Sequence, residues 1–266
     1  MTASPSNPAA PPYPAAHDLL NGKTVVVTAA AGAGIGLAAA RRCLEEGARV
    51  VISDWHERRL GETLDDLLGV HGDAVAALRC DVTSEDDVQA LLAFAVERFG
   101  RLDVMINNAG LGGTKSLLDM TDEEWTRVLD VTLNGTFRCT RAALRQMVAQ
   151  GGGGAVVNNA SVIGWRAQEG QAHYAAAKAG VMALTRCAAL DAAPHGIRVN
   201  AVSPSLAMHP HLAKVTSDEL LAELTKREAF GRYAEPWEIA NVMVFLASDY
   251  SSYLTGEVIS VSSQHP

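Results

Sequence analysis

The chain has 266 residues, which is enough for one sizeable domain with a full hydrophobic core. Its net charge of −8 argues against nucleic acid or an anionic membrane as the main partner. No apolar run approaches the roughly 20 residues that span a bilayer, and the four scattered cysteines suit free thiols in a reducing cytoplasm.

Residues 1–18 are rich in Pro and Ala and lack the pattern of a signal peptide, so we expect a flexible tail before a single domain over 19–266. From there strand-like and helix-like segments alternate. Strands are expected over 24–28, 49–53, 74–78, 104–106, 155–160, 198–203 and 257–261. Helices are expected over 35–46, 57–68, 85–99, 121–147, around 174–178, 218–226 and 236–248. This alternation predicts an α/β fold with a mostly parallel sheet covered on both faces, and a ligand site at the carboxyl ends of the strands.

A glycine-rich turn joins the first predicted strand to the first predicted helix. Gly32, Gly34 and Gly36 let the backbone approach a pyrophosphate, and the helix that begins at Ile35 offers oriented N–H groups. Any tight strand-to-helix turn also favours glycine, so the turn alone is weak support for a nucleotide site.

Asp54 ends the second predicted strand, 18 residues after Gly36. A carboxylate there can accept hydrogen bonds from both ribose hydroxyls and would repel a 2′-phosphate, which favours NAD over NADP. Asp81 follows the third strand, where it could meet the adenine or simply support the next helix beside Ser84.

Tyr174 and Lys178 are four residues apart, so a helix would present both on one face. Ser161 lies just after the fifth predicted strand, from where its hydroxyl can face them. A nearby cation lowers the pKa of a phenol from about 10, so the three groups could move a proton to or from a substrate oxygen. A surface lysine beside a half-buried tyrosine is the plain alternative.

Taken together, these motifs resemble the classical short-chain dehydrogenase/reductase family over residues 20–262. The resemblance rests on the glycine turn, Asp81-Val82, Asn107–Gly110, Ser161, Tyr174-x-x-x-Lys178 and Asn200–Pro204. It implies a Rossmann-type three-layer sandwich with a seven-stranded parallel sheet in the order 3-2-1-4-5-6-7, hydride transfer at nicotinamide C4, and a homotetramer or dimer.

The resemblance also implies roles for individual residues. Tyr174 is the expected general acid/base, Lys178 binds the nicotinamide ribose and lowers the pKa of the tyrosine, and Ser161 orients the substrate oxygen. Residues expected to line the cofactor are Gly32, Gly34, Ile35, Gly36, Asp54, Asp81, Val82, Asn108, Ala109, Gly110, Tyr174, Lys178, Pro204 and Ser205.

Four positions depart from the family pattern. Ala29-Ala30 stands where the family has its Thr-Gly opening of the turn, and Ser205 stands where the family has a glycine after Pro204. The catalytic asparagine of the long helix falls on Thr132, a possible replacement in the proton relay. The usual Asp-Gly-Gly ending is Ser262-Ser263-Gln264.

Within the family, the chain resembles actinobacterial dehydrogenases that degrade the last two steroid rings as hydroxy-hydrindane acyl-CoA thioesters. Trp165, Arg166 and His209 are then possible substrate contacts, and residues 205–232 a lid. We expect no metal, because no Cys or carboxylate completes a site beside His209 and His211.

Two alternatives remain open at this stage. The first is a 3-oxoacyl-CoA or acyl-carrier-protein reductase of fatty-acid type, which would more often use NADPH. The second is a catalytically inactive nucleotide-binding regulator, suggested by Thr132 and the altered glycine turn but opposed by the intact Ser161, Tyr174 and Lys178.

Overall fold

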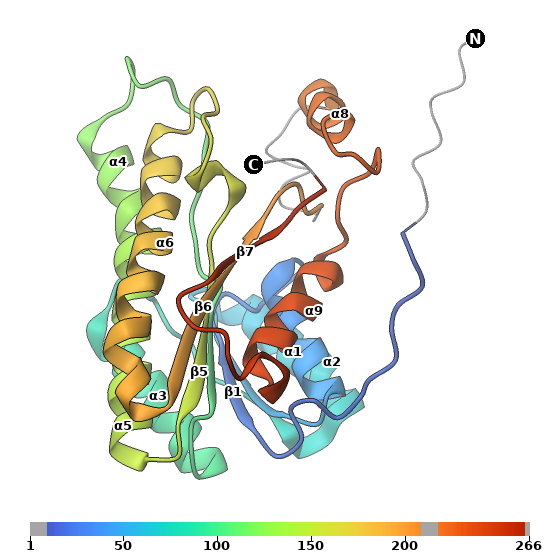
Figure 1. Cartoon of the computed structure of the whole chain (residues 1–266), viewed down its shortest axis with the longest axis vertical. Helices are drawn as coiled ribbons and strands as arrows, with labels where there is room; N and C mark the ends of the chain where they lie inside the picture. The colour runs from blue at the N-terminus through green and yellow to red at the C-terminus, as the bar shows by residue number, and fades with distance from the viewer. Residues whose placement is uncertain (1–9, 209–217, 264–266) are drawn as a thin grey trace.

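A seven-stranded parallel sheet forms the centre of the computed structural model in Figure 1, which describes residues 10–208 and 218–263. The strand order is β3-β2-β1-β4-β5-β6-β7, which confirms the predicted Rossmann-type fold. The strands are β1 Thr24–Val27, β2 Arg49–Ile52, β3 Val75–Ala77, β4 Val104–Asn107, β5 Gly154–Asn159, β6 Ile197–Pro204 and β7 Val258–Val261.

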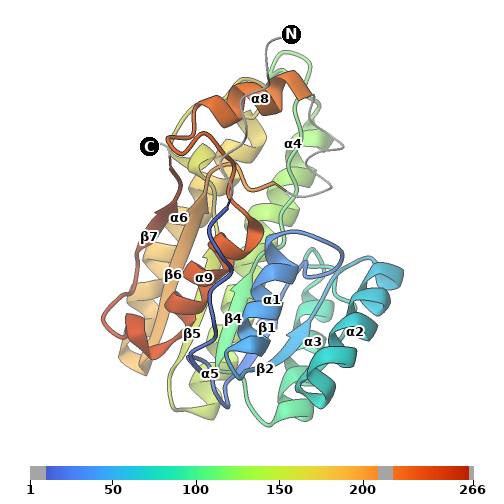
Figure 2. The same cartoon turned by 90° about the vertical axis from the view of Figure 1, so that its right-hand side faces the viewer.

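Helices cover both faces of this sheet, so the molecule has three layers. Figures 1 and 2 show α1, α2 and α9 on one face, and α3, α5 and α6 on the other, with α4 extending the second layer. The helices are α1 Ile35–Glu45, α2 Glu57–His71, α3 Glu85–Phe99, α4 Asp122–Leu129, α5 Gly135–Gln150, α6 Ala172–Ala192, α8 Asp218–Lys226 and α9 Pro236–Ala247. None of these helices is long and apolar enough to cross a bilayer, within the ranges described.

The hydrophobic core lies on both sides of the sheet, and β1 shows why. Val25 and Val27 pack into the cluster under α1 and α9, whereas Val26 packs into the cluster under α3 and α5. Successive side chains of a strand point to opposite faces, so a strand buried on both faces must be apolar throughout. The continuous valine run of β1 follows from this position.

The long helix predicted over 121–147 is interrupted in the structure. It consists of α4 and α5 joined by a π-helical turn over Asp130–Asn134. At the start of α5, a Cβ on Gly135 would lie 2.7 Å from Val82 Cγ2, so only glycine allows this approach. Thr132, inside the turn, bonds to the backbone of Leu111. Contacts with distant segments therefore accompany a break that the local helical pattern does not predict.

Part of the N-terminal segment that is predicted as a flexible tail over 1–18 contacts α1. Residues 1–9 lie outside the described ranges, but Tyr13 donates a hydrogen bond of 2.7 Å to Glu45, and the His17 N–H donates one of 2.9 Å to Glu46. Both acceptors belong to α1 or its end. Tyr13 and His17 are therefore bonded to the domain, and the boundary at residue 19 stays a prediction.

After β6 the chain crosses the carboxyl end of the sheet, where Figures 1 and 2 both place α8. Ala207 forms a parallel bridge with Ala234, which holds the two ends of the predicted lid together. Residues 209–217 of this lid lie outside the described residues, so its closing over a substrate stays a prediction.

Candidate active site

The glycine-rich turn after β1 leads directly into α1. A Cβ on Gly36 would lie 2.2 Å from the Ala29 carbonyl oxygen, so this position excludes every other residue. No side chain caps the first turn of α1 at Gly34. Uncapped N–H groups at a helix start are a ready site for a phosphate, so the turn fits the pyrophosphate of a dinucleotide.

The segment after β4 is bonded to this turn. The N–H groups of Asn108 and Ala109 both donate to Thr28 Oγ1 at 3.0 Å, and Asn108 Nδ2 donates to the Ala29 carbonyl at 3.0 Å. Ala29 itself has φ +49°, a left-handed conformation that favours glycine. The structure thus brings Asn108 and Ala109 beside the predicted pyrophosphate site.

Asp54 lies at the end of β2, 6% exposed, and its Oδ1 accepts a 2.9 Å bond from the His56 N–H. The guanidinium of Arg59 lies 3.6 Å from the same oxygen. Sequence analysis did not single out Arg59, because it stands five residues beyond Asp54. His56 is the N-cap of α2, so Arg59 lies in the first turn of this helix, close to the end of β2. A helix start directly after Asp54 was the sequence signal that could have identified Arg59.

The two expected cofactor residues after β3 are placed less favourably. Asp81 Oδ1 accepts bonds from the Thr83 N–H at 3.0 Å and from the Thr83 hydroxyl at 2.8 Å, which is a local turn at the start of α3. Val82 is 7% exposed, and its side chain packs in the hydrophobic core. The backbone of Val82, and not its side chain, is therefore the candidate for a contact with a nucleotide.

The structure brings Ser161, Tyr174 and Lys178 together as the spacing predicted. Ser161 follows β5, and α6 presents Tyr174 and Lys178 on one face. Tyr174 shares a hydrogen bond with the Ser161 side chain, and Lys178 Nζ lies 5.6 Å from the centroid of the tyrosine ring. Lys178 is 3% exposed and donates a 2.5 Å bond to the Asn159 carbonyl.

The electrostatics of this trio differ from the expectation. Burial raises the pKa of Tyr174 above its ordinary value, and the hydrogen bond with Ser161 only partly opposes this. Burial also lowers the pKa of Lys178 to about 8. Burial and the Ser161 hydrogen bond are the causes of this shift, so the expected acidification of the phenol by Lys178 is not found in the ligand-free protein. The phenol is protonated at neutral pH, which suits donation of a proton.

A chain of amides links Lys178 to the glycine-rich turn. The Asn159 carbonyl accepts from Lys178, and Asn159 Nδ2 donates to Asn108 Oδ1 at 2.9 Å. Asn108 continues the chain to the Ala29 carbonyl. Asn159 Oδ1 is buried without a partner. Sequence analysis did not single out Asn159, although two asparagines in succession at the end of a buried strand were a signal.

Thr132 is hydrogen-bonded to the loop over residues 110–112, which lies next to Tyr174 and Lys178. Its hydroxyl accepts a 2.9 Å bond from the Leu111 N–H and donates a 3.0 Å bond to the Leu111 carbonyl. A Cβ on the preceding Gly110 would lie 3.4 Å from Lys178 Nζ, and one on Gly112 would lie 3.6 Å from the Tyr174 ring. The Thr132 proton is therefore engaged by the loop, and its place in a proton relay stays a prediction.

The remaining predicted positions surround this centre. Pro204 is buried at the end of β6, and the N–H of Ser205 donates to the Val261 carbonyl at 3.3 Å. Trp165 is 41% exposed and follows Ser161 closely, and the Arg166 N–H donates to the Val162 carbonyl at 3.2 Å. His209 lies outside the described residues, and the described ranges contain no His, Cys, Asp or Glu group that could hold a metal.

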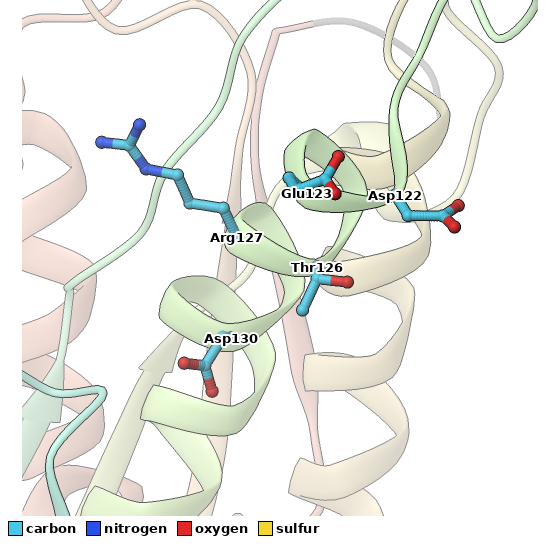
Figure 3. A pocket seen from close by; sticks show the side chains of 5 residues that line it. All are labelled: Asp122, Glu123, Thr126, Arg127 and Asp130. Carbon is cyan, nitrogen blue, oxygen red and sulfur yellow. The ribbon is translucent and has the colours of Figure 1, made fainter.

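A surface depression on α4, shown in Figure 3, contains none of the candidate residues. Asp122, Glu123, Thr126, Arg127 and Asp130 line it. In Figure 3 the Arg127 side chain extends away from Asp122, and the lining is acidic on balance. Such a surface does not resemble a dinucleotide site, so the candidate site remains the carboxyl end of the sheet.

Comparisons with known proteins agree with this geometry. Residues 29–263 match a family model described as enoyl-(acyl carrier protein) reductase. The (5R,7aS)-5-hydroxy-7a-methyl-1-oxo-2,3,5,6,7,7a-hexahydro-1H-indene-carboxyl-CoA reductase of Mycobacterium tuberculosis is 64% identical, over 97% of this chain and 98% of the relative. A 3-oxoacyl-[acyl-carrier-protein] reductase of Staphylococcus aureus is 37% identical, over 90% of this chain and 96% of the relative.

Among solved structures, a short chain dehydrogenase from Mycobacterium smegmatis superposes with a TM-score of 0.86. It is 59% identical, and the match covers 97% of this chain and 99% of that chain. These similarities show an oxidoreductase that acts on an alcohol or ketone, and the inactive regulator is not supported. Members of the family typically bind NAD(P). The chain belongs to the short-chain dehydrogenase/reductase family.

Proposed function

We propose that this protein interconverts a secondary alcohol and a ketone on a steroid-derived hydrindane acyl-CoA, with NAD as the preferred cofactor. The observation that carries the proposal is the convergence of Ser161, Tyr174 and Lys178 beside the glycine-rich turn. The 64% identity to a reductase named for a hydrindane carboxyl-CoA supports the substrate class.

The side chains suit the following chemistry. A bound nicotinamide dinucleotide supplies or accepts the hydride. Tyr174 gives its proton to the carbonyl oxygen during reduction and takes it back during oxidation. Ser161 donates a hydrogen bond to the same oxygen, and Lys178 holds the charge that develops near the phenol. The loop over Gly110 to Gly112, tied down by Thr132, limits where a substrate can lie.

The preference for NAD rests on Asp54. Its carboxylate is buried at the end of β2, where it can accept ribose hydroxyls and would repel a 2′-phosphate. Trp165 offers an exposed ring surface for a fused-ring substrate, and Arg166 offers a cation for a CoA carrier. The exposed Trp125, Phe137 and Val148 of α4 and α5 are consistent with a homo-oligomer.

A substrate screen tests the proposal. Hydrindane and straight-chain hydroxyacyl-CoA thioesters are supplied with NAD+ or NADP+, and the absorbance of the reduced cofactor is followed. The expected result is turnover of the hydrindane thioester with NAD+ preferred. Better turnover of straight-chain 3-hydroxyacyl thioesters with NADP+ would instead support a reductase of fatty-acid type. The 37% identity to the Staphylococcus aureus 3-oxoacyl-[acyl-carrier-protein] reductase is the observation behind this second candidate.

Substitution of Tyr174 tests the role of the phenol. We expect Tyr174→Phe to lower kcat by about 10²–10⁴-fold, because the proton donor is lost. NADH binding, followed by nucleotide fluorescence, should change little, since Lys178 and the glycine turn remain. Tyr233→Phe, outside the trio, is the matched control and should retain activity. Substantial turnover by Tyr174→Phe would refute the assignment.

A further inference from the structure

The side chain of His173 caps the first turn of α6. Gln171, at the N-cap position of this helix, makes no capping hydrogen bond with its side chain. The imidazole of His173 does so instead, because its Nδ1 accepts the N–H of Tyr174 at 2.9 Å. The first N–H groups of a helix have no partner within the helix, so the ring supplies one of them with an acceptor. The backbone of Tyr174 is thereby bonded to the residue before it.

The imidazole ring lies between α6 and the loop that precedes α4. His173 is 3% exposed, and because its Nδ1 accepts a hydrogen bond, its proton is on Nε2. A Cβ on Gly113 would lie 3.9 Å from this Nε2, and one on Gly112 would lie 3.6 Å from the ring of Tyr174. Two successive glycines of the loop therefore pack against two successive residues of α6.

We propose that His173 is a positioning residue for Tyr174. Its Nδ1 fixes the first turn of α6, and its ring sets how closely the loop approaches this turn. The phenol of Tyr174 then stays in contact with Ser161 and within reach of a substrate oxygen. His173 itself moves no proton and touches no reacting atom. This inference rests on the proposed function, in which Tyr174 is the proton donor, and it adds a residue outside the trio.

Three substitutions separate the two ring nitrogens. Asparagine places an oxygen close to the position of Nδ1, glutamine places its amide near Nε2, and leucine offers neither group. With the hydrindane thioester and NAD+, His173→Leu and His173→Gln should lower kcat by about tenfold or more, because the phenol loses its fixed place. KM and the dissociation constant of NADH should stay within about threefold. His173→Asn should keep kcat within about threefold of wild type, because the acceptor is kept.

His195→Leu is the matched control, since His195 is exposed in the short helix that follows α6. It should leave kcat unchanged. Wild-type kcat in His173→Leu would overturn the proposal. An equal loss in His173→Asn and His173→Leu would also overturn it, because the acceptor would then not matter. If His173→Leu does not fold, the comparison of His173→Asn with His173→Gln decides the question.

A double substitution shows whether His173 acts through Tyr174. In Tyr174→Phe the proton donor is already lost, so the position of the ring should matter little. Adding His173→Leu to Tyr174→Phe should therefore lower the residual turnover by less than about twofold. A further loss of about tenfold would mean that His173 acts independently of the phenol, and would overturn the proposal.

Amide hydrogen exchange tests the bond without any substrate. The chain has five tyrosines, so labelling with ¹⁵N-tyrosine gives few amide signals, and the signal missing from Tyr174→Phe is that of Tyr174. Exchange of this N–H should be about fivefold or more faster in His173→Leu and unchanged in His173→Asn. If no hydrindane thioester is turned over, the proposed function fails while this comparison still tests the bond. Unchanged exchange in His173→Leu would overturn the inference even in an active enzyme.

Discussion

Lys178 is buried, and its surroundings disfavour the charged ammonium. It is 3% exposed, its Nζ donates to the Asn159 carbonyl, and burial lowers its pKa to about 8. In the unfolded chain a lysine titrates near pH 10.4. Folding therefore disfavours the ammonium at every pH below about 8, and this cost disappears once the unfolded chain is also neutral. The proposed chemistry keeps a group that destabilises the ligand-free fold.

Lys178→Met should therefore stabilise the ligand-free protein near neutral pH while it removes activity. Removal of the buried charge should raise the free energy of unfolding by on the order of 3 kcal/mol. Loss of the hydrogen bond to the Asn159 carbonyl should lower it by about 1 kcal/mol. Between about pH 8 and pH 10.4 the advantage over wild type should shrink. In this range Lys178 is neutral in the folded state, and the free-energy difference from the unfolded chain falls as the unfolded lysine also loses its proton. Urea unfolding at several pH values measures this. An advantage that is independent of pH would contradict the explanation.

At the scale of elements, the interruption between α4 and α5 is the feature that shapes the site. The π-helical turn places the Thr132 hydroxyl against both backbone groups of Leu111. Thr132 is fully buried, so the loss of its hydroxyl would leave these two backbone groups of Leu111 without this partner. π-Helical turns inside helices often occur at functional sites, and here the turn fixes the loop that lies over Tyr174 and Lys178.

Thr132→Val should cost about 2 kcal/mol of unfolding free energy, because two hydrogen bonds to the partly buried N–H and C=O of Leu111 are lost. We also expect kcat to fall by about tenfold or more as the loop loses its fixed position. Thr132→Ser keeps the hydroxyl and should restore most activity. Thr126→Val, on the exposed face of α4, is the control for the substitution itself. Full activity in Thr132→Val would show that the loop does not depend on this bond.

For the whole molecule, the N-terminal segment joins α1 to α9. Glu46 is fully buried and accepts bonds from the N–H groups of His17 and Leu19, and from the guanidinium of Arg42 at 2.6 Å. Arg42 lies over the Tyr13 ring, and that ring contacts Trp237 of α9 edge-to-face at 5.3 Å between centroids. Tyr13, His17 and Leu19 thus connect this segment to α1 and α9.

Glu46→Gln should destabilise the protein by about 3 kcal/mol, because the buried Nη2 of Arg42 loses its carboxylate partner and only the more exposed Glu45 remains. Glu45→Gln is the matched control. Glu45 also pairs with Arg42, but its side chain is 32% exposed, so we expect a loss below about 1 kcal/mol. Urea unfolding of the two variants and wild type measures the difference. Equal losses would mean that burial of Glu46 does not matter.

Local patterns predicted a large part of this protein. The alternation of strands and helices, the valine run of β1 and the glycine-rich turn follow from periodicity and from the conformational needs of each residue. The four-residue spacing of Tyr174 and Lys178 follows from the pitch of a helix. These features depend on neighbours in sequence, so the sequence alone determined the α/β class, the nucleotide turn and the Ser161, Tyr174 and Lys178 trio.

The tertiary structure decided the contacts between segments that are far apart in the chain. Asn159 meets Asn108 only because β4 and β5 are neighbours in register, and Thr132 meets Leu111 across a loop. Arg59 reaches Asp54 only because α2 folds back over β2. The raised pKa of Tyr174 also depends on burial by the whole fold. Spacing cannot report such distances or desolvation, because both arise only when separate elements pack against each other.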